Sequence, residues 1–186
     1  MRVIAGTAGG LPLKTPRTDL RPTMDKVRGA IFDSLGEFVI GARVLDLFAG
    51  CGSLGIEALS RGAQSVTFIE LDRRAVAAIE VNLSRTSLTG EVLGADVFRY
   101  LDRAAPASFD LILADPPYAK APAERDFTAE LLASAGLRHT LTPDGFFVLE
   151  HLPGAALALD PHWECVRDKR YGATAVALLR PRNLRA

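Results

Sequence analysis

Short apolar runs alternate with amphipathic helical patterns along most of this chain, and this alternation constrains its fold more than any other feature. The strand-like runs are Arg43 to Phe48, Ser65 to Ile69, Glu91 to Ala95, Phe109 to Ala114 and Gly145 to Glu150. The helical patterns cover Leu54 to Arg61, Arg73 to Ser84, Phe98 to Asp102 and Phe127 to Leu137. Strands that alternate with helices predict a parallel sheet covered on both faces, the α/β class. A chain of 186 residues, 48% of them apolar, suits a single domain of this kind.

The N-terminal end departs from the alternation. Met1 to Ala5 and Leu11 to Pro16 are extended candidates joined through glycines, which predicts a small hairpin within an extension over residues 1–20. The catalytic core is then expected over residues 21–186. It begins with an amphipathic helix that opens at Pro22-Thr23 and stops at Gly36.

The C-terminal end predicts an antiparallel hairpin. Trp163 to Arg170 and Thr174 to Arg180 are strand-like and flank a short turn at Tyr171-Gly172-Ala173. A dehydrogenase-type sheet is expected to continue with parallel units, whereas a parallel sheet that ends in a hairpin resembles the class I methyltransferase fold. We therefore expect a Rossmann-like, mainly parallel sheet of seven strands with helices on both faces.

A glycine-rich loop follows the first predicted strand. Gly50, Gly52 and Gly55 match the pattern G-x-G-x-x-G, and Glu70 lies 20 residues beyond Gly50 at the end of the second strand. Such glycines allow a ligand to approach the backbone closely, and the carboxylate can accept hydrogen bonds from ribose hydroxyls. Because NAD and S-adenosylmethionine both contain that ribose, the spacing alone does not choose between them.

Asp46 favours S-adenosylmethionine. A carboxylate at the end of the first strand disfavours a pyrophosphate but suits a ligand that carries a sulfonium and an ammonium group. The string with Asp46, Phe48, Gly50 and Gly52 also resembles motif I of class I methyltransferases, written D-x-F-x-G-x-G. The residues expected to bind the cofactor are Thr23, Asp46, Phe48, Gly50, Gly52, Glu70, Leu71, Asp96 and Val97.

Asp96 has two readings. It follows the third strand, at the position where the family's carboxylate accepts a hydrogen bond from the adenine amino group, with the Val97 backbone nearby. An aspartate ahead of a short helix is, taken singly, more often an N-cap. Both roles stay open at this point.

The tetrapeptide Asp115-Pro116-Pro117-Tyr118 follows the fourth strand and indicates chemistry on an exocyclic amine. The lone pair of such an amine is delocalised into the base, and acceptors for its two N–H groups would favour a pyramidal, nucleophilic nitrogen. The Asp115 carboxylate and the Pro116 carbonyl can be those acceptors, since the prolines stiffen the loop and offer no N–H. Tyr118 offers a ring for base stacking, worth about 1 to 3 kcal/mol in single-stranded binders.

The chain resembles the RsmD-type 16S rRNA guanine-N2 methyltransferases over nearly its whole length. The matching segments are Arg2 to Gly6, Leu20 to Arg28, Asp46 to Gly55, Glu57 to Ala63, Asp115 to Tyr118 and Tyr171-Gly172. The resemblance implies direct in-line methyl transfer from S-adenosylmethionine to a guanine N2 of 16S rRNA in an assembled or partly assembled small subunit. It places Thr23 near the methionine part of the donor. One departure is Cys51, where the family often has serine; we interpret this residue as packing in the loop.

The same resemblance assigns the remaining roles. Asp115, Pro116 and Tyr118 are then the catalytic residues, and the substrate-binding candidates are Pro117, Arg17, Arg21 and Lys26. Arg28 has two alternatives: a phosphate contact or an internal ion pair.

Charge and composition limit the partners. The net charge is zero, but residues 1–28 and residues 161–186 each carry +4, which is compatible with phosphate contacts from the two ends. Cys51, Cys165 and the three histidines show no metal-binding spacing, so no metal is expected. No apolar run reaches the length of a membrane span, and we expect a cytoplasmic monomer.

Other functions remain as alternatives. A DNA adenine-N6 methyltransferase can use the same tetrapeptide but usually carries a substantial target-recognition domain, and only 68 residues follow Tyr118. A protein-glutamine methyltransferase would be expected to have asparagine in place of Asp115. A nicotinamide-dependent oxidoreductase leaves the tetrapeptide unexplained. A ribosome-assembly factor that binds RNA without catalysis would not need Asp115, Glu70 and the glycine loop together.

Overall fold

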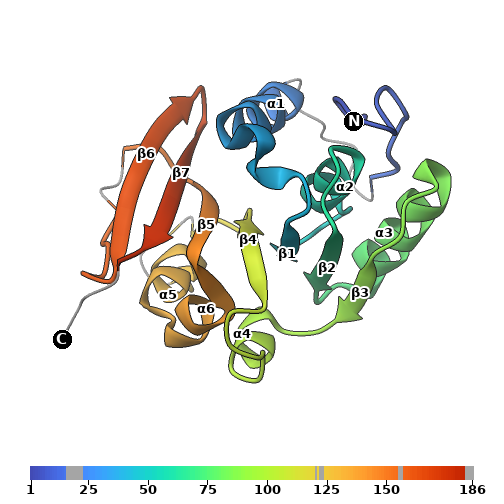
Figure 1. Cartoon of the computed structure of the whole chain (residues 1–186). Coiled ribbons are helices and arrows are strands. Elements are labelled where there is room, and N and C mark those ends of the chain that lie inside the picture. Colours follow the sequence, from blue (N-terminus) through green and yellow to red (C-terminus); the bar gives the residue numbers. More distant parts are fainter. Residues whose placement is uncertain (16–22, 120, 122–123, 155–156, 183–186) are drawn as a thin grey trace.

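Seven strands form one sheet in the order β3-β2-β1-β4-β5-β7-β6 (Figure 1). The computed structural model describes residues 1–15, 23–119, 121, 124–154 and 157–182. The strands are β1 (Arg43–Leu47), β2 (Ser65–Glu70), β3 (Glu91–Gly94), β4 (Phe109–Ala114), β5 (Leu141–His151), β6 (Trp163–Tyr171) and β7 (Thr174–Pro181). β1 to β5 run parallel, and β7 pairs antiparallel with both β5 and β6. The predicted class of sheet, with its antiparallel end, is confirmed.

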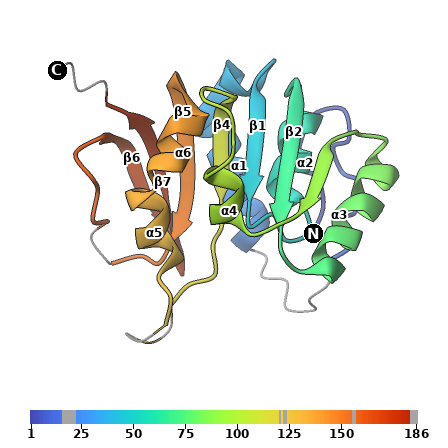
Figure 2. The same ribbon diagram turned by 90° about the horizontal axis from the view of Figure 1, so that it is seen from below.

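Helices cover both faces of this sheet. They are α1 (Thr23–Leu35), α2 (Ser53–Ser60), α3 (Arg73–Thr86), α4 (Val97–Leu101), α5 (Phe127–Ala133) and α6 (Ala135–Thr140), with a 3₁₀ turn, η1, at Gly36–Val39. Figure 2 shows α4, α5 and α6 in front of the sheet and α1 and α2 behind it. Successive residues of β4 enter opposite cores: Leu111 and Leu113 pack on the side of α1 to α3, and Ile112 packs on the side of α4 to α6. Because both faces are buried, the strand is a continuous apolar run.

One of the predicted helices is divided into two helices in the structure. The pattern from Phe127 to Leu137 was expected to form a single helix, but the chain leaves the helix at Ser134, whose φ and ψ are −65° and 113°. The Ser134 hydroxyl then caps α6 by accepting from the Leu137 amide at 3.1 Å. Gly136 lies so close to α4 that a Cβ there would be 2.8 Å from the Leu101 carbonyl oxygen. The break therefore lets α6 pack tightly against α4, a tertiary contact that helical periodicity does not reveal.

The N-terminal segment is less regular than predicted. The expected pair of extended segments shares one antiparallel bridge, between Arg2 and Pro12, and forms no longer strand pair over residues 1–15. Its apolar residues Val3, Ala8 and Leu13 are nevertheless buried in the core with α1 to α3. Gly6 fits against the end of α2 where a Cβ would lie 1.8 Å from the Ser60 carbonyl oxygen. Burial against α2, not strand pairing, fixes this segment.

Two buried polar side chains tie the N-terminal segment to the core. Glu57 on α2 accepts from the Ile4 and Ala5 amides at 2.7 and 3.1 Å. Asn82 on α3 accepts from the Lys14 amide at 2.7 Å and donates to the Lys14 carbonyl oxygen at 2.9 Å. Its amide nitrogen also donates to the carbonyl oxygen of Cys51, at 2.9 Å, and so joins the segment to the glycine loop.

Arg28 is an internal ion-pair residue. Its side chain is 3% exposed, and its Nη2 lies 3.0 Å from Asp25 Oδ1. Its Nε lies 3.6 Å from Glu57 Oε2, and its Nη2 also donates to the Arg2 carbonyl oxygen. Of the two alternatives for Arg28, the phosphate contact is therefore wrong, because the guanidinium is buried among these partners.

Candidate active site

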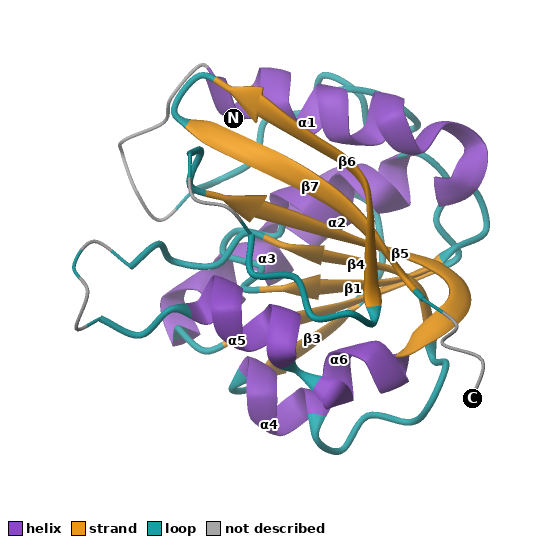
Figure 3. Cartoon of the chain, turned by 90° about the vertical axis from the view of Figure 1, so that its left-hand side faces the viewer, coloured by secondary structure: helices purple, strands orange, loops and turns teal. Residues whose placement is uncertain are grey.

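The strand register gathers the predicted site residues at one edge of the sheet. Leu47, the last residue of β1, pairs with Ile69 of β2 and with Ala114 of β4. The residues that follow, Glu70 and Asp115, therefore lie on either side of the loop after β1. In Figure 3 the arrowheads of β1 and β4 point to this same edge. The strand order reverses between these two strands, and open α/β sheets bind ligands at that point.

The loop after β1 depends on left-handed backbone conformations. Gly50 and Gly52 have φ angles of +58° and +78°, which glycine adopts without steric cost. A Cβ at Gly55 would lie 2.3 Å from the Phe68 ring, so the third glycine allows α2 to pack on β2. Phe48 also has a positive φ, +55°, in a region that non-glycine residues rarely adopt. Such strain is typical of functional loops, and no sequence signal indicated it.

Asp46 lies buried beneath this loop, with 1% of its surface exposed. Its Oδ2 accepts a hydrogen bond from the Gly55 amide at 2.9 Å. Burial raises the pKa of Asp46 well above its usual range; Asp115 and Glu70 add to the rise, and the Gly55 hydrogen bond opposes it. A positively charged ligand at this edge would stabilise the ionised form of all three carboxylates.

The Glu70 carboxylate accepts hydrogen bonds from backbone amides of the same loop and of the turn that follows β2. Its Oε2 accepts from the Gly50 amide at 2.7 Å, and its Oε1 accepts from the Asp72 amide at 2.8 Å. Each carboxylate oxygen has a second lone pair, so these bonds are compatible with acceptance from ribose hydroxyls. The next residue, Leu71, is 68% exposed and offers an apolar surface beside the loop.

Asp96 is an N-cap, which is one of the two roles predicted for it. Its Oδ1 accepts from the Arg99 amide at 3.0 Å at the start of α4, and the Val97 side chain is buried. The adenine contact stays a prediction.

An aromatic cluster lies beside Asp96. Phe48, Phe98 and Phe127 have ring centroids 5.3 to 6.5 Å apart. The Arg125 guanidinium lies 4.9 Å from the Phe98 ring centroid and 4.7 Å from that of Phe127. The strained Phe48 backbone thus aims its ring into a packed cluster that joins the glycine loop to α4 and α5.

The tetrapeptide after β4 is partly buried. Pro116 is buried, Pro117 is exposed, and Asp115 and Tyr118 lie between these extremes. Burial of the Asp115 carboxyl, together with the charge of Glu150, raises its pKa from 3.8 to about 7. The Tyr118 hydroxyl donates to Glu150 Oε1 at 3.2 Å and shares a hydrogen bond with Thr174 Oγ1 at 2.8 Å. Sequence reasoning missed Glu150 and Thr174, because neither lies near a recognisable motif.

The predicted substrate residues are only partly described. Lys26 is exposed on the first turn of α1, which begins at Thr23. Arg17 and Arg21 lie outside the described residues, as does the side chain of Thr23. Their roles stay predictions. Among the described residues, no group of three histidine, cysteine, aspartate or glutamate side chains could hold a metal ion, and no helix is long and apolar enough to cross a membrane.

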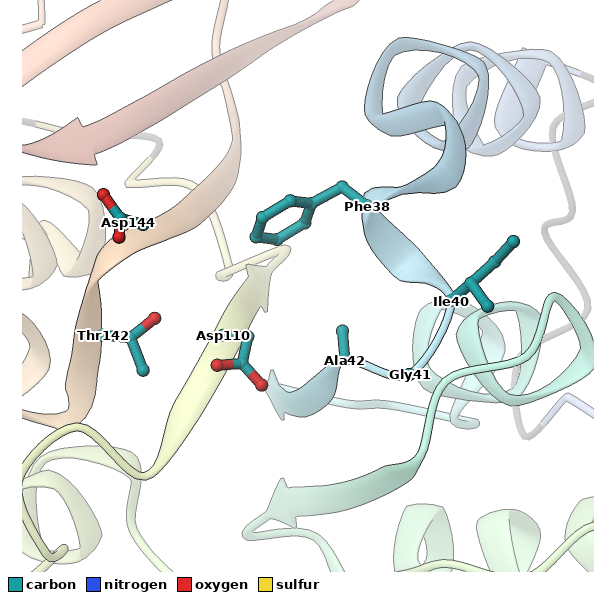
Figure 4. A pocket seen from close by; sticks show the side chains of 7 residues that line it. All are labelled: Phe38, Ile40, Gly41, Ala42, Asp110, Thr142 and Asp144. Carbon is teal, nitrogen blue, oxygen red and sulfur yellow. The ribbon is translucent and has the colours of Figure 1, made fainter.

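A shallow pocket of about 230 Å³ lies at the opposite edge of the sheet (Figure 4). Its lining residues are Phe38, Ile40, Gly41, Ala42, Asp110, Thr142 and Asp144. Arg43 already holds Asp110, with 2.9 Å between Nη2 and Oδ1, and lowers the pKa of that carboxyl. The strand β4 separates Asp110 from Asp115 by roughly 16 Å at the usual rise per residue. The pocket is therefore not part of the site around Asp115.

Comparison with known proteins identifies the family. The Bacillus subtilis protein "Putative rRNA methyltransferase YlbH" is 39% identical, over 98% of this chain and 100% of its own length. The Escherichia coli protein named Ribosomal RNA small subunit methyltransferase D is 32% identical, over 96% of this chain and 88% of its own. The family model described as Conserved hypothetical protein 95 matches residues 1–180. The chain belongs to the RsmD family.

Solved structures agree with this RsmD-family assignment. The Escherichia coli structure titled "Putative methyltransferase yhhF" superposes with a TM-score of 0.81 at 28% identity, with 97% of each chain covered. A methylase structure from Haemophilus influenzae superposes with a TM-score of 0.77 at 28% identity, again with 97% of each chain covered. The fold is that of the class I methyltransferases.

The RsmD-family site fits S-adenosylmethionine, the methyl donor of this class. Asp46, Glu70 and Asp115 converge on one edge, and burial makes their mutual repulsion costly unless a cation is present. The glycine loop leaves its backbone free of side chains at Gly50 and Gly52, and Leu71 offers an uncovered apolar surface. Asp46 and the loop would hold the charged end of the donor, and Glu70 with Leu71 its nucleoside.

Proposed function

We propose that this RsmD-family methyltransferase transfers a methyl group from S-adenosylmethionine directly to the exocyclic N2 of a guanine in 16S rRNA. The observation that carries the proposal is the position of Asp115 to Tyr118 after β4, next to the glycine loop after β1. The relatives named for small-subunit rRNA methylation support the RNA substrate. The substrate we propose is an assembled or partly assembled small subunit.

The chain's own residues activate the amine. Asp115 and the Pro116 carbonyl accept hydrogen bonds from its two N–H groups, which localises the nitrogen lone pair. Pro116 and Pro117 fix the loop, so little reorganisation accompanies the reaction. The Tyr118 ring stacks against the base. When bound, S-adenosylmethionine supplies an electrophilic methyl group on a sulfonium. No metal and no covalent enzyme intermediate are required.

The role of Asp115 in this proposal gives the first prediction. Asp115→Asn should lower single-turnover methylation at least about a hundredfold, since the amide oxygen still accepts a hydrogen bond but the negative charge that interacts with the developing positive charge is lost. The substrate is small subunits from a strain that lacks the family's enzyme, with donor labelled on its methyl group and the modified base mapped. Asp144→Asn, an exposed carboxylate at the opposite edge, is the matched control and should keep full activity.

Each outcome decides between hypotheses. Label on a guanine N2 of 16S rRNA supports the proposal. Label on adenine N6 favours the DNA-type amine chemistry that shares the tetrapeptide, and label on protein or no label at all from the wild type overturns the assignment. An Asp115→Asn protein that methylates at the wild-type rate would refute the mechanism but not the substrate.

A further inference from the structure

A half-buried network of hydrogen bonds behind the tetrapeptide joins three elements of the site. Tyr118, which follows β4, reaches Glu150 on β5 at 3.2 Å and Thr174 on β7 at 2.8 Å. Thr174 Oγ1 also lies 3.3 Å from the His151 carbonyl oxygen, so the first residue of β7 is itself fixed to β5. The phenol therefore has partners on both strands, and its hydroxyl oxygen cannot leave this position without losing two hydrogen bonds.

Glu150 is the member of this network that also acts on Asp115. Its charge is one of the two causes that raise the pKa of Asp115, the larger being burial. Burial raises the pKa of Glu150 as well, while hydrogen bonds from Thr174 and Tyr118 oppose that rise. Two carboxyl groups that interact in this way titrate as a pair. Ala114 of β4 pairs with Leu149 of β5, so the residues that follow them, Asp115 and Glu150, are neighbours at the ends of adjacent strands.

We propose that Glu150 is a positioning residue of the active site, which fixes the Tyr118 ring through its hydroxyl and, by its charge, keeps Asp115 ready to accept the proton that leaves the methylated amine. This inference rests on the proposed amine chemistry. In that step the amine N–H bond breaks and an O–H bond forms at Asp115, which later releases the proton to solvent. The carboxyl's pKa of about 7 suits both uptake and release near neutral pH.

Other ionisable groups near this pair do not replace Glu150. Asp46 is an acid neighbour of Asp115, buried under the glycine loop and held by the Gly55 amide. His151, the neighbour of Glu150, has its Nε2 3.1 Å from Asp168 on β6 and tends to lower the pKa of Glu150. Tyr118 is a further titratable group of this network, and burial raises the pKa of its phenol, so it stays neutral at the pH of assay.

Three variants separate the two actions of Glu150. Glu150→Gln keeps a hydrogen-bond acceptor for Tyr118 but removes the charge. Glu150→Ala removes both the acceptor and the charge. Tyr118→Phe keeps the ring and the Glu150 charge but removes the hydroxyl. Glu164→Gln, an exposed carboxylate on β6, is the matched control.

The expected results concern both titration and kinetics. The Asp115 carboxyl, followed by ¹³C NMR in the enzyme without donor, should titrate near pH 7 in the wild type and in Glu164→Gln, and about one pH unit lower in Glu150→Gln. The acid limb of kcat/KM should move in the same direction. Tyr118→Phe should leave the titration near the wild-type value but raise KM for the subunit about tenfold. Glu150→Ala should show both effects.

The outcomes also separate this inference from the proposed function. An Asp115 titration that is the same in Glu150→Gln and the wild type would refute the charge coupling. A Tyr118→Phe protein with an unchanged KM would refute the positioning role. Label on adenine instead of guanine would overturn the proposed substrate while leaving the titration and its response to Glu150→Gln intact. Thermal unfolding of each variant shows whether a loss reflects misfolding, and restoration of KM in Glu150→Gln relative to Glu150→Ala indicates a specific hydrogen bond.

Discussion

At the scale of single residues, the most telling feature is the buried Asp46 carboxyl beneath the glycine loop. With 1% of its surface exposed, it receives one hydrogen bond from a neutral amide, and burial raises its pKa well above the usual range. A protein gains nothing in stability from such a group, since apolar residues of similar size would pack there at lower cost. The position makes sense for a site that binds a cation.

Binding of the methyl donor should therefore release protons. Burial raises the pKa of Asp46 well above its usual range and that of Asp115 to about 7, and a nearby sulfonium or ammonium group lowers both pKa values, so protons leave on binding. Calorimetric titration at pH 7 in buffers of different ionisation enthalpy measures this release directly. S-adenosylhomocysteine is the matched ligand, because it lacks the sulfonium charge, and it should release fewer protons.

Two further comparisons test the prediction that donor binding releases protons. Equal proton release by the two ligands would show that the sulfonium does not act on these carboxylates. The Asp46→Asn protein should bind the donor more weakly and release fewer protons than the wild type.

At the scale of elements, the sequence predicted the repeating units well and the contacts between distant segments poorly. The bounds of β1, β2, β4, β6 and β7 differ from expectation by one residue or less, because apolar runs and turn residues mark them. The sequence predicted that the glycine loop, Glu70 and Asp115 lie at the ends of strands because each belongs to a fixed motif, and their roles stay predictions. Glu150 was not predicted, because its role depends on which strand lies beside β4 and on where the Tyr118 hydroxyl points.

The other misses have the same cause. The break at Ser134 arises from the close packing of Gly136 on α4, and the irregular N-terminal segment arises from its burial against α2. Both are decided by partners far away in sequence. The local propensity of a segment does not predict contacts with residues that are distant in sequence. A pattern of buried residues shows that an element packs against the core, but it does not show which element it contacts.

Asn82 shows how one such partner bears on the site. It is fully buried on α3 and bonds both Lys14 and the Cys51 carbonyl oxygen of the glycine loop. Asn82→Ala should lower the free energy of unfolding by about 1 to 3 kcal/mol, because buried backbone groups lose their partners. It should also weaken donor affinity, since the loop loses its support from α3.

Two measurements check this prediction. Urea denaturation gives the stability, and calorimetry gives the donor affinity. Glu80→Ala, an exposed residue on the same helix, should change neither. An Asn82→Ala protein with wild-type donor affinity would show that the glycine loop is rigid without the contact.

At the scale of the whole molecule, the net charge is zero, but residues 1–28 and residues 161–186 each carry a net charge of +4. In the structure α1 runs toward the segment that enters β1, so its first turn, with Lys26, lies toward the edge that holds Asp115 (Figure 3). Arg103 is also exposed but lies ahead of β4, at the other edge. The two residues thus form a natural pair for testing where RNA binds.

Lys26→Glu should lower kcat/KM for small subunits about tenfold at low salt and flatten its dependence on salt by about one phosphate contact. Arg103→Glu should leave both unchanged, and donor affinity should be the same in both variants. Rates measured across a series of salt concentrations check this. Equal losses in the two variants would indicate a general effect of charge in place of a localised RNA contact.

The order of the strands has a consequence for synthesis. The last strand along the described chain, β7, lies between β5 and β6, so β6 emerges from the ribosome before the strand that it must pair with. Thr174, the first residue of β7, is also a partner of Tyr118. A nascent chain in which the glycine loop and the tetrapeptide are already synthesised therefore lacks the hydrogen bond between Thr174 and Tyr118 until β7 inserts. This hydrogen bond is formed only in the same step that joins β6 to the rest of the sheet.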